Sequence, residues 1–148
     1  MFESKNIKPM LIGEMQAAFD SPDYIYELKL DGEWCIAYLD NDTTELRNKQ
    51  NIKVLSKVPE LSKIHKQIKC RCILDGELIV TKYGKPNFYK IQRRSLMSNT
   101  FKIQLASSKL PASFAAFDIL ISSIITFFRI YSMLSLSYCI KFSSNLIF

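Results

Sequence analysis

The sequence contains a single histidine, His65, which argues against a metal site built from several histidines. His65 stands between Lys63 and Lys66, so we expect it on the surface and outside any catalytic role. The cysteines also lack a metal-binding pattern, because one residue separates Cys70 from Cys72 and zinc-binding pairs need a gap of about two to four. Both cysteines fall on one face of a predicted strand, where we expect reduced, packed thiols.

The N-terminus has no apolar signal core, so nothing indicates export, and we expect a cytoplasmic protein. Acidic residues are absent after Asp118, and the remaining thirty residues carry only two cations, Arg129 and Lys141. The net charge of +6 and the pI near 9.1 permit a polyanionic partner without identifying one. The length of 148 residues suits one domain with a sizeable core.

Local patterns predict an α+β domain in which antiparallel sheets are flanked by helices. A hairpin is expected around the Asp31-Gly32 turn, and a second arm follows the turn at residues 40–42. The predicted strands are 24–28, 34–39, 43–47, 72–81 and 111–121. The predicted helices are 55–68, with Pro59 in its first turn, and the basic segment 88–97. Residues 83–86 are predicted to form a loop.

Residues 119–140 are mostly apolar, and three interpretations of this tail stay open. The length would suffice for a membrane span, but Arg129 near its middle would cost about 2.5–3.5 kcal/mol on insertion. An ordinary core helix is the second interpretation. We favour the third, an accidental or degenerate tail, because the segment lacks acids, glycine and proline and is biased towards serine, isoleucine and phenylalanine. Membrane association is therefore not expected.

The segment Lys29-Leu30-Asp31-Gly32 carries a candidate nucleophile at the point where a strand enters a tight turn. A lysine amine is a poor nucleophile while it is protonated, so a catalytic lysine needs surroundings that lower its pKa. Taken alone, these four residues favour the alternative interpretation, a surface hairpin whose lysine has no function. The neighbouring motifs decide between the two interpretations.

Six segments in order resemble ATP-dependent DNA ligases of the bacterial repair type, whose nucleotidyltransferase signature has the core Lys-x-Asp-Gly-x-Arg. The segments are Glu27-Leu28-Lys29-Leu30-Asp31-Gly32, Leu46-Arg47-Asn48, Val58-Pro59-Glu60-Leu61, Leu74-Asp75-Gly76-Glu77, Phe88 to Arg94, and Ala116-Phe117-Asp118-Ile119-Leu120. The resemblance spans residues 23–120, preceded by a lead-in (1–22) and followed by the apolar tail (121–148). It implies a partial, ATP-grasp-like nucleotidyltransferase (ligase adenylation) domain.

By this resemblance, Lys29 attacks the α-phosphate of ATP, expels pyrophosphate and holds AMP through a phosphoramidate. The AMP then passes to the 5′-phosphate of nicked double-stranded DNA, and the neighbouring 3′-hydroxyl displaces it to seal the nick. ATP and Mg²⁺ are the implied cofactors, and DNA repair, recombination and replication the implied settings. The oligomeric state is not predicted.

The resemblance also implies roles for five residues around the nucleotide. Glu27 and the backbone of Leu28 would read the adenine, and Phe117 would stack on its face. Arg47 would contact the nucleotide or the nick phosphate. Glu77 would hold the ribose hydroxyls or a magnesium ion. Without the motifs, Glu27 and Arg47 are equally compatible with solvated strand-edge charges. Glu77 is compatible with a surface acid, and Phe117 would by default be a core residue.

The segment Gln92-Arg93-Arg94 lies on the predicted basic helix, and both arginines are candidate DNA contacts. A solvated helix face is the alternative. RNA ligases and capping guanylyltransferases share the lysine motif, but the Arg47-Asn48, Gln92-Arg93-Arg94 and Phe117-to-Leu120 segments favour a DNA ligase.

The sequence departs from the family pattern at two places. Trp34 stands where the signature ends in arginine, which removes a cation expected near the nucleotide. After Leu120 we find neither the later Glu-Gly-x-x-x-Lys and paired-lysine motifs nor an oligonucleotide-binding barrel. We therefore expect a truncated adenylation domain of doubtful activity. The alternative is a non-catalytic remnant that binds nucleotide or DNA, with a membrane-associated tail as a variant.

Overall fold

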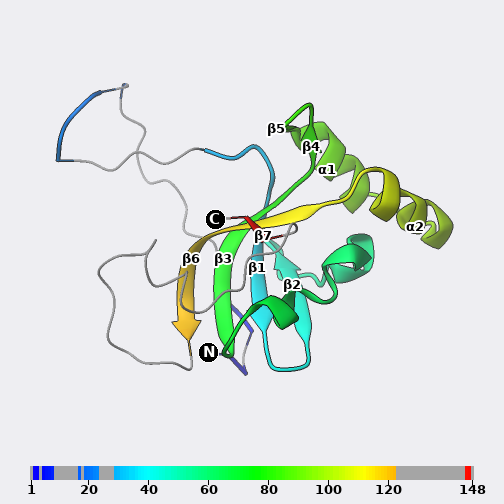
Figure 1. Cartoon of the computed structure of the whole chain (residues 1–148), viewed down its shortest axis with the longest axis horizontal. Coiled ribbons are helices and arrows are strands. Elements are labelled where there is room, and N and C mark those ends of the chain that lie inside the picture. Colours follow the sequence, from blue (N-terminus) through cyan, green and yellow to red (C-terminus); the bar gives the residue numbers. More distant parts are fainter. Residues whose placement is uncertain are drawn as a thin grey trace.

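The computed structural model describes residues 2–3, 5–8, 17, 19–23, 29–122 and 146–147, and a five-stranded sheet forms the centre of this part (Figure 1). The strand order is β2-β1-β3-β6-β7, antiparallel except for the parallel pair of β6 and β7. The strands are β1 (Glu33–Leu39), β2 (Thr44–Asn48), β3 (Cys72–Ile79), β6 (Ser113–Ser122) and β7 (Leu146–Ile147). With helices at its flank, the sheet confirms the predicted α+β class.

The turn after β1 forms where the sequence predicts it. The backbone amide of Asp40 donates to the carbonyl of Thr43 (3.0 Å), and the amide of Asn41 donates to the side chain of Asp40 (2.9 Å). Short polar side chains of this kind stabilise turns by binding nearby amides. The hairpin arm predicted at residues 24–28 lies outside the described residues, and β1 pairs with β2 along one edge and with β3 along the other.

The single helix predicted for residues 55–68 is wrong. Three short 3₁₀ helices occupy the segment instead: η1 (Leu55–Lys57), η2 (Pro59–Leu61) and η3 (Ile64–Gln67). Pro59, the first residue of η2, lacks an amide hydrogen, so a continuous series of α-helical hydrogen bonds cannot run through it. Val58, Leu61 and Ile64 are nevertheless buried, because a spacing of three residues also fits the 3₁₀ repeat.

Two α-helices follow β3 in the chain, and the sequence predicted one of them. The predicted basic helix is α1 (Phe88–Ser95), and the side chain of Asn87 caps it by accepting from the amide of Lys90. The second, α2 (Thr100–Lys109), was not predicted; Asn99 caps it in the same way, and Ile103 is its one buried residue. Both lie towards the end of the sheet where β3 ends and β6 begins (Figure 1).

A tight hairpin connects β3 to α1 where the sequence predicted a loop. Strands β4 (Thr81–Lys82) and β5 (Lys85–Pro86) pair with each other, and the two turn residues between them, Tyr83 and Gly84, have φ of 53° and 75°. Two successive residues with positive φ are typical of a type I′ turn, which glycine favours.

The main hydrophobic core lies on the face of the sheet that packs against η1–η3 and α1. It contains Leu39, Leu46, Leu74, Leu78 and Phe114 of the sheet among others. The three cysteines of the described part are buried there, which confirms the expected packing role. The second face carries a smaller cluster of Ile36, Tyr38 and Ile73, partly covered by the N-terminal residues Phe2 and Ile7.

His65 corrects a second expectation, because it is buried rather than on the surface. Its ring nitrogen Nδ1 lies 3.0 Å from the hydroxyl of Thr44, whose oxygen also accepts the backbone amide of His65 (3.2 Å). The histidine therefore joins η3 to the start of β2. None of the helices in the described ranges has the length and apolar character to cross a bilayer, and most of the apolar tail lies outside those ranges.

Candidate functional site

Gly32 brings the Lys29 segment against the end of β3. A Cβ atom at Gly32 would lie 2.5 Å from the carbonyl oxygen of Leu78 and 2.8 Å from Cγ2 of Ile79. Both contacts are too short for a carbon, so only glycine permits this approach of the two backbones. Lys29 precedes this contact by three residues and is exposed at the same end of the sheet.

The pKa of Glu77 in β3 depends on the charged residues near this turn. Burial raises the pKa of Glu77 above its ordinary value, and the nearby charges of Asp31 and Asp75 add to the rise. The positive charge of Lys29 and a hydrogen bond from the backbone of Gly32 oppose it. Lys29 and Glu77, which are far apart in sequence, are therefore close enough to interact electrostatically.

Trp34 and Asp75 extend this cluster across the sheet. Trp34 stands directly opposite Glu77 in the antiparallel register of β1 and β3. Burial raises the pKa of Asp75 to about 6, the charge of Asp118 adds to the rise, and hydrogen bonds from the Trp34 side chain and the Gly76 backbone oppose it. The position at which the resemblance expects an arginine thus holds a neutral hydrogen-bond donor.

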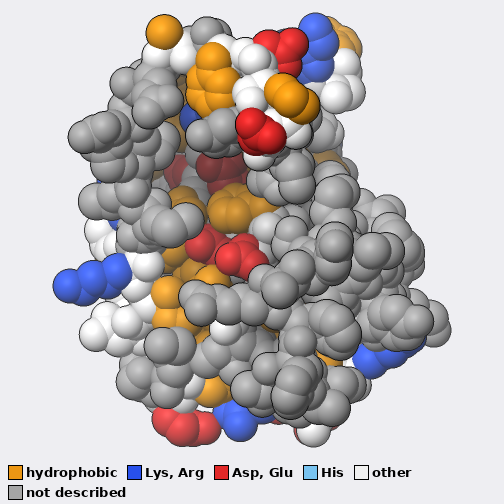
Figure 2. Space-filling view, turned by 90° about the vertical axis from the view of Figure 1, so that its left-hand side faces the viewer, with side chains coloured by type: hydrophobic (Ala, Val, Ile, Leu, Met, Phe, Trp, Pro, Cys, Tyr) orange, Lys and Arg blue, Asp and Glu red, His pale blue; other side chains and the backbone are white. Residues whose placement is uncertain are grey.

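Two carboxylate oxygens in this cluster have unused bonding capacity. Oε2 of Glu77 and Oδ1 of Asp75 are buried and have no hydrogen-bond partner among the described residues. Such atoms suit ribose hydroxyls or a magnesium ion, which binds few protein carboxylates and keeps several waters. The described part of the chain contains no cluster of three or more side chains that could hold a metal ion. Acidic and hydrophobic side chains lie together on the side that β6 borders (Figure 2).

Phe117 lies at an irregularity in β6. Asp75 pairs with Asp118 while its neighbour Gly76 pairs with Ala116, so Phe117 is an extra residue without a partner on β3. This is a β-bulge, a feature that redirects a side chain. The ring is 43% exposed, which excludes the interpretation of Phe117 as a core residue. A flat aromatic surface is therefore available to a ligand next to Asp75.

Arg47 lies on the sheet in the same row as Asp75, since both residues stand opposite Ile36 of β1. Its Nε donates to Glu45 (2.6 Å), and its Nη1 donates to the backbone and side-chain oxygens of Asn51 (3.0 and 3.1 Å). Arg47 is thus held by protein groups on a partly buried surface and is not a freely solvated charge.

Glu45 is the centre of this charged group. Its burial would raise its pKa, but hydrogen bonds from Arg47, Lys53 and Lys5 outweigh burial and lower the pKa to about 2. A phosphate that binds Arg47 must therefore share it with Glu45. The other two predicted nucleotide contacts, Glu27 and Leu28, lie outside the described residues.

Arg94 corrects the expectation of a DNA contact. Its side chain is completely buried, paired with Glu60, and donates to the carbonyl oxygens of Lys57 (2.8 Å) and Leu110 (3.0 Å). Glu60 also accepts the backbone amide of Ala112 (2.7 Å). Arg94 therefore anchors α1 to η2 and to the approach of β6, and it offers no surface to DNA.

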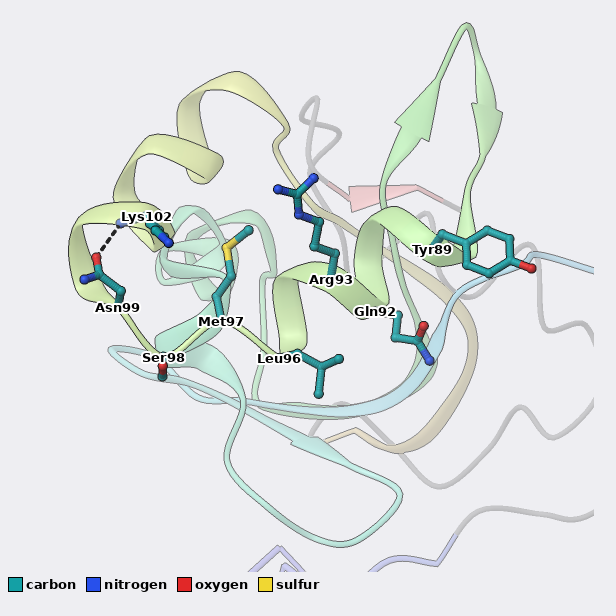
Figure 3. Close-up of a pocket in the computed structure, with 8 residues that line it drawn as sticks. All are labelled: Tyr89, Gln92, Arg93, Leu96, Met97, Ser98, Asn99 and Lys102. Carbon is teal, nitrogen blue, oxygen red and sulfur yellow. Dashed lines mark hydrogen bonds between the residues drawn. The ribbon is translucent and has the colours of Figure 1, made fainter.

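Arg93, the neighbouring candidate, is exposed and lines an open pocket of about 450 Å³ between α1 and α2 (Figure 3). Tyr89 and Lys102 also line it. The sequence interpretation assigned no role to Tyr89, Lys102 or Asp75. Asp75 lies within the segment Leu74-Asp75-Gly76-Glu77, so the sequence did point to its neighbourhood. Lys102 lies on α2, which the sequence did not predict, so no motif or spacing identified Lys102.

Comparison with known proteins gives consistent matches. Residues 8–130 match the family model described as ATP dependent DNA ligase domain. The chain is 32% identical over 115 residues to DNA ligase C of Mycobacterium tuberculosis, covering 77% of this chain and 31% of that protein. It is 35% identical over 89 residues to the SPbeta prophage-derived DNA ligase-like protein LigB of Bacillus subtilis, covering 60% of this chain and 32% of LigB.

Solved structures show the same fold. A mycobacterial DNA ligase D complexed with ATP and MES matches with a TM-score of 0.52 and 24% identity, over 65% of this chain and 29% of that chain. The ligase domain of LigD from M. tuberculosis matches similarly, with a TM-score of 0.52 and 23% identity over the same shares. The chain spans about a third of the length of the relatives it matches.

Proposed function

Because the chain belongs to the ATP-dependent DNA ligase domain family, we propose that it carries the adenylation site of such an enzyme, with Lys29 as the nucleophile. The observation that carries the proposal is the contact of Gly32 with β3, which brings Lys29 within electrostatic reach of Glu77. A reactive amine beside a carboxylate with unused bonding capacity is an arrangement suited to nucleotide chemistry.

In the proposed reaction, the amine of Lys29 loses its proton and attacks the α-phosphorus of ATP. A nitrogen–phosphorus bond forms while the bond to pyrophosphate breaks, which leaves AMP on the lysine. Magnesium would neutralise charge on the departing phosphates. The cell compartment we propose is the cytoplasm.

The neighbouring residues are proposed to hold the nucleotide. Phe117 stacks on the adenine, and its exposure on the bulge of β6 supports this role. Glu77 accepts hydrogen bonds from the ribose or contributes to a magnesium site, supported by its unpartnered oxygen. Arg47 contacts a phosphate while retaining Glu45 as its partner. For Glu27 and Leu28, adenine recognition rests on the family resemblance.

Nicked double-stranded DNA is the proposed acceptor of the AMP, with Arg93 as a contact from α1. Sealing a nick requires the activity of the whole relatives, of which this chain spans about a third. One observation favours a second candidate function, a non-catalytic remnant that binds nucleotide or DNA. Trp34 replaces the motif cation, and Arg47, the arginine that the resemblance assigns to the nucleotide or the nick phosphate, is already engaged by Glu45.

Covalent labelling tests the proposal. The purified chain is incubated with magnesium and ATP labelled at the α-phosphate, and the label on denatured protein is counted. We expect wild type to carry label and Lys29→Ala to carry none, while the exposed Lys66→Ala retains it. Label that survives in Lys29→Ala would exclude Lys29, and no label in any variant would favour the remnant.

The Trp34→Arg variant separates the two candidates further. An arginine opposite Glu77 restores a charge-assisted contact, so we expect labelling to rise several-fold. If wild type and Trp34→Arg label equally, the missing cation is not a limitation of this site.

A further inference from the structure

The surface formed by the β4–β5 hairpin, α1 and α2 is positively charged because its sequence contains no acid. Between Glu77 and Asp118 the chain has no acidic residue, and its cations there are Lys82, Lys85, Lys90, Arg93, Arg94, Lys102 and Lys109. Arg94 is neutralised by Glu60, but none of the others forms an ion pair with a residue of the described part. This surface is therefore complementary to a polyanion.

The pocket between α1 and α2 is lined by two cations and an aromatic residue, and Figure 3 shows Arg93 between Lys102 on one side and Tyr89 on the other. Arg93 of α1 and Lys102 of α2 line it from the two helices, together with Gln92 and Leu96. Tyr89 lies one helical turn before Arg93, and its ring is 79% exposed. An edge contact with Phe88, at 6.2 Å between ring centroids, helps to hold that ring.

The helices that form the pocket are fixed to the rest of the protein. The buried Arg94, which follows the exposed Arg93 in the chain, anchors α1 to the rest of the protein through Glu60. Asn99, which also lines the pocket, caps α2 through the amide of Lys102 (3.0 Å). The positions of the two cations are therefore set by packed structure and not by a loose surface loop.

The pocket lies at the same end of the sheet as the Lys29 segment. The hydroxyl of Ser95, which stands in α1 between the pocket residues Arg93 and Leu96, donates a hydrogen bond to Glu33. Glu33 is the first residue of β1 and follows Gly32 directly. A strand held in the pocket would thus lie near the turn that carries Lys29.

We propose that the α1–α2 pocket binds single-stranded nucleic acid, with phosphates on Arg93 and Lys102 and a base stacked on Tyr89. The exposed ring favours a single strand over a duplex, because a base offers its face for stacking only when it is unpaired. Gln92 supplies an amide to the base edge. The inference rests on the proposed function and deepens it, because it assigns an unpaired strand to the surface where Arg93 was proposed to contact DNA.

Fluorescence anisotropy with a labelled 20-residue oligothymidylate tests this inference, without ATP or magnesium. We expect Tyr89→Leu to weaken binding about tenfold and Tyr89→Phe to retain it, since stacking needs the ring and not the hydroxyl. The double variant Arg93→Gln/Lys102→Gln should lower the slope of log affinity against log salt by about 1.4, the value for two phosphates on a single strand.

Matched controls lie elsewhere on the surface. Tyr83→Asn removes an exposed ring outside the pocket at a position whose positive φ asparagine tolerates, and Lys66→Gln removes an exposed cation of η3. Both should bind as wild type does. The inference is overturned if Tyr89→Leu binds equally well, if the controls weaken binding as much, or if a duplex of equal length competes as well. Lys29→Ala should bind normally, so failure of lysine adenylation and failure of this site remain distinguishable.

Discussion

At the scale of single residues, the candidate site contains a carboxyl group that holds its proton more tightly than an ordinary aspartate does. Asp75 has a pKa of about 6 in the folded protein against an ordinary value of 3.8, mainly because it is buried. Its Oδ1 has no hydrogen-bond partner among the described residues, so its ionised form is poorly solvated. A bound cation or hydroxyl donor would remove this penalty.

Replacing Asp75 by asparagine should therefore change how stability depends on pH. A raised pKa means that the folded protein binds the proton more tightly than the unfolded chain. The resulting stabilisation is present below pH 3.8 and is lost as the pH rises through about 6. We expect Asp75→Asn to gain about 1 kcal/mol relative to wild type between pH 4 and pH 7, a reduced value because solvent screens the half-buried group.

Urea unfolding of both proteins at a series of pH values measures this difference. Glu45, with its pKa of about 2, produces the opposite dependence on pH in both proteins, so its effect cancels in the comparison. A constant difference between the two proteins from pH 4 to pH 7 would show that Asp75 titrates normally.

At the scale of the elements, α1 depends on one buried ion pair. Arg94 joins α1 to Glu60 of η2, and Glu60 in turn holds the amide of Ala112 before β6. Breaking a buried pair by removing one partner costs about 3–5 kcal/mol, because the other charge is left without compensation. The neighbouring Arg93 is exposed and outside any such pair.

We expect Arg94→Met to lower the free energy of unfolding by about 3 kcal/mol or more, and Arg93→Met by less than about 0.5 kcal/mol. Urea denaturation followed by circular dichroism gives both values. The double variant Arg94→Met/Glu60→Gln should recover part of the loss, since it removes the unpaired carboxylate as well. Equal losses in Arg94→Met and Arg93→Met would contradict the anchoring role.

The elements also show what the sequence could and could not predict. Turn residues and apolar, β-rich runs predicted β1, β2, β3 and β6, and β1 and β3 are buried on both faces of the sheet. Helix α2 was missed because it buries only Ile103 and leaves Phe101 and Leu105 exposed, so it has no apolar stripe. The helix predicted at 55–68 shares its spacing of three with 3₁₀ turns, and spacing alone does not distinguish them.

The candidate site, like the fold, could be predicted from the sequence only in part. The order of the motifs predicted Lys29 and Glu77 together, and the structure brings them into electrostatic contact. The roles of Arg93 and Arg94 could not be separated by sequence, because their difference depends on Glu60, 34 residues from Arg94. Long-range partners of this kind leave no local pattern.

At the scale of the whole molecule, the sheet ends at β6 and the two residues of β7. The pairing of β6 with β7 involves only Phe114 with Leu146 and Ala115 with Ile147. Among the described residues, the main core lies on β1, β2, β3 and β6 and on α1 and η1–η3. The region after Ser122 therefore contributes two residue pairs to the described sheet.

Removing residues 123–148 should consequently have a small effect on folding. We expect the free energy of unfolding to fall by less than about 1 kcal/mol, the scale of a cross-strand pair or two. Urea unfolding of the full and shortened chains measures it, with membrane fractionation of both as a second readout. A fall of several kcal/mol would mean that the tail packs on the core, and recovery of only the full chain with membranes would indicate a membrane segment.

The bulge in β6 changes which residues of the strand face the main core. Before the bulge, Phe114 and Ala116 face the main core, and after it Ile119 does, so the inward positions change from even to odd numbers. Removing Phe117 would take out this bulge, whereas the second register shift of β6, between the pairs Ile73–Ile121 and Leu74–Ile119, would remain. Phe117 has no partner on β3 and is 43% exposed, so the bulge leaves its ring open to the adenine stacking proposed for it.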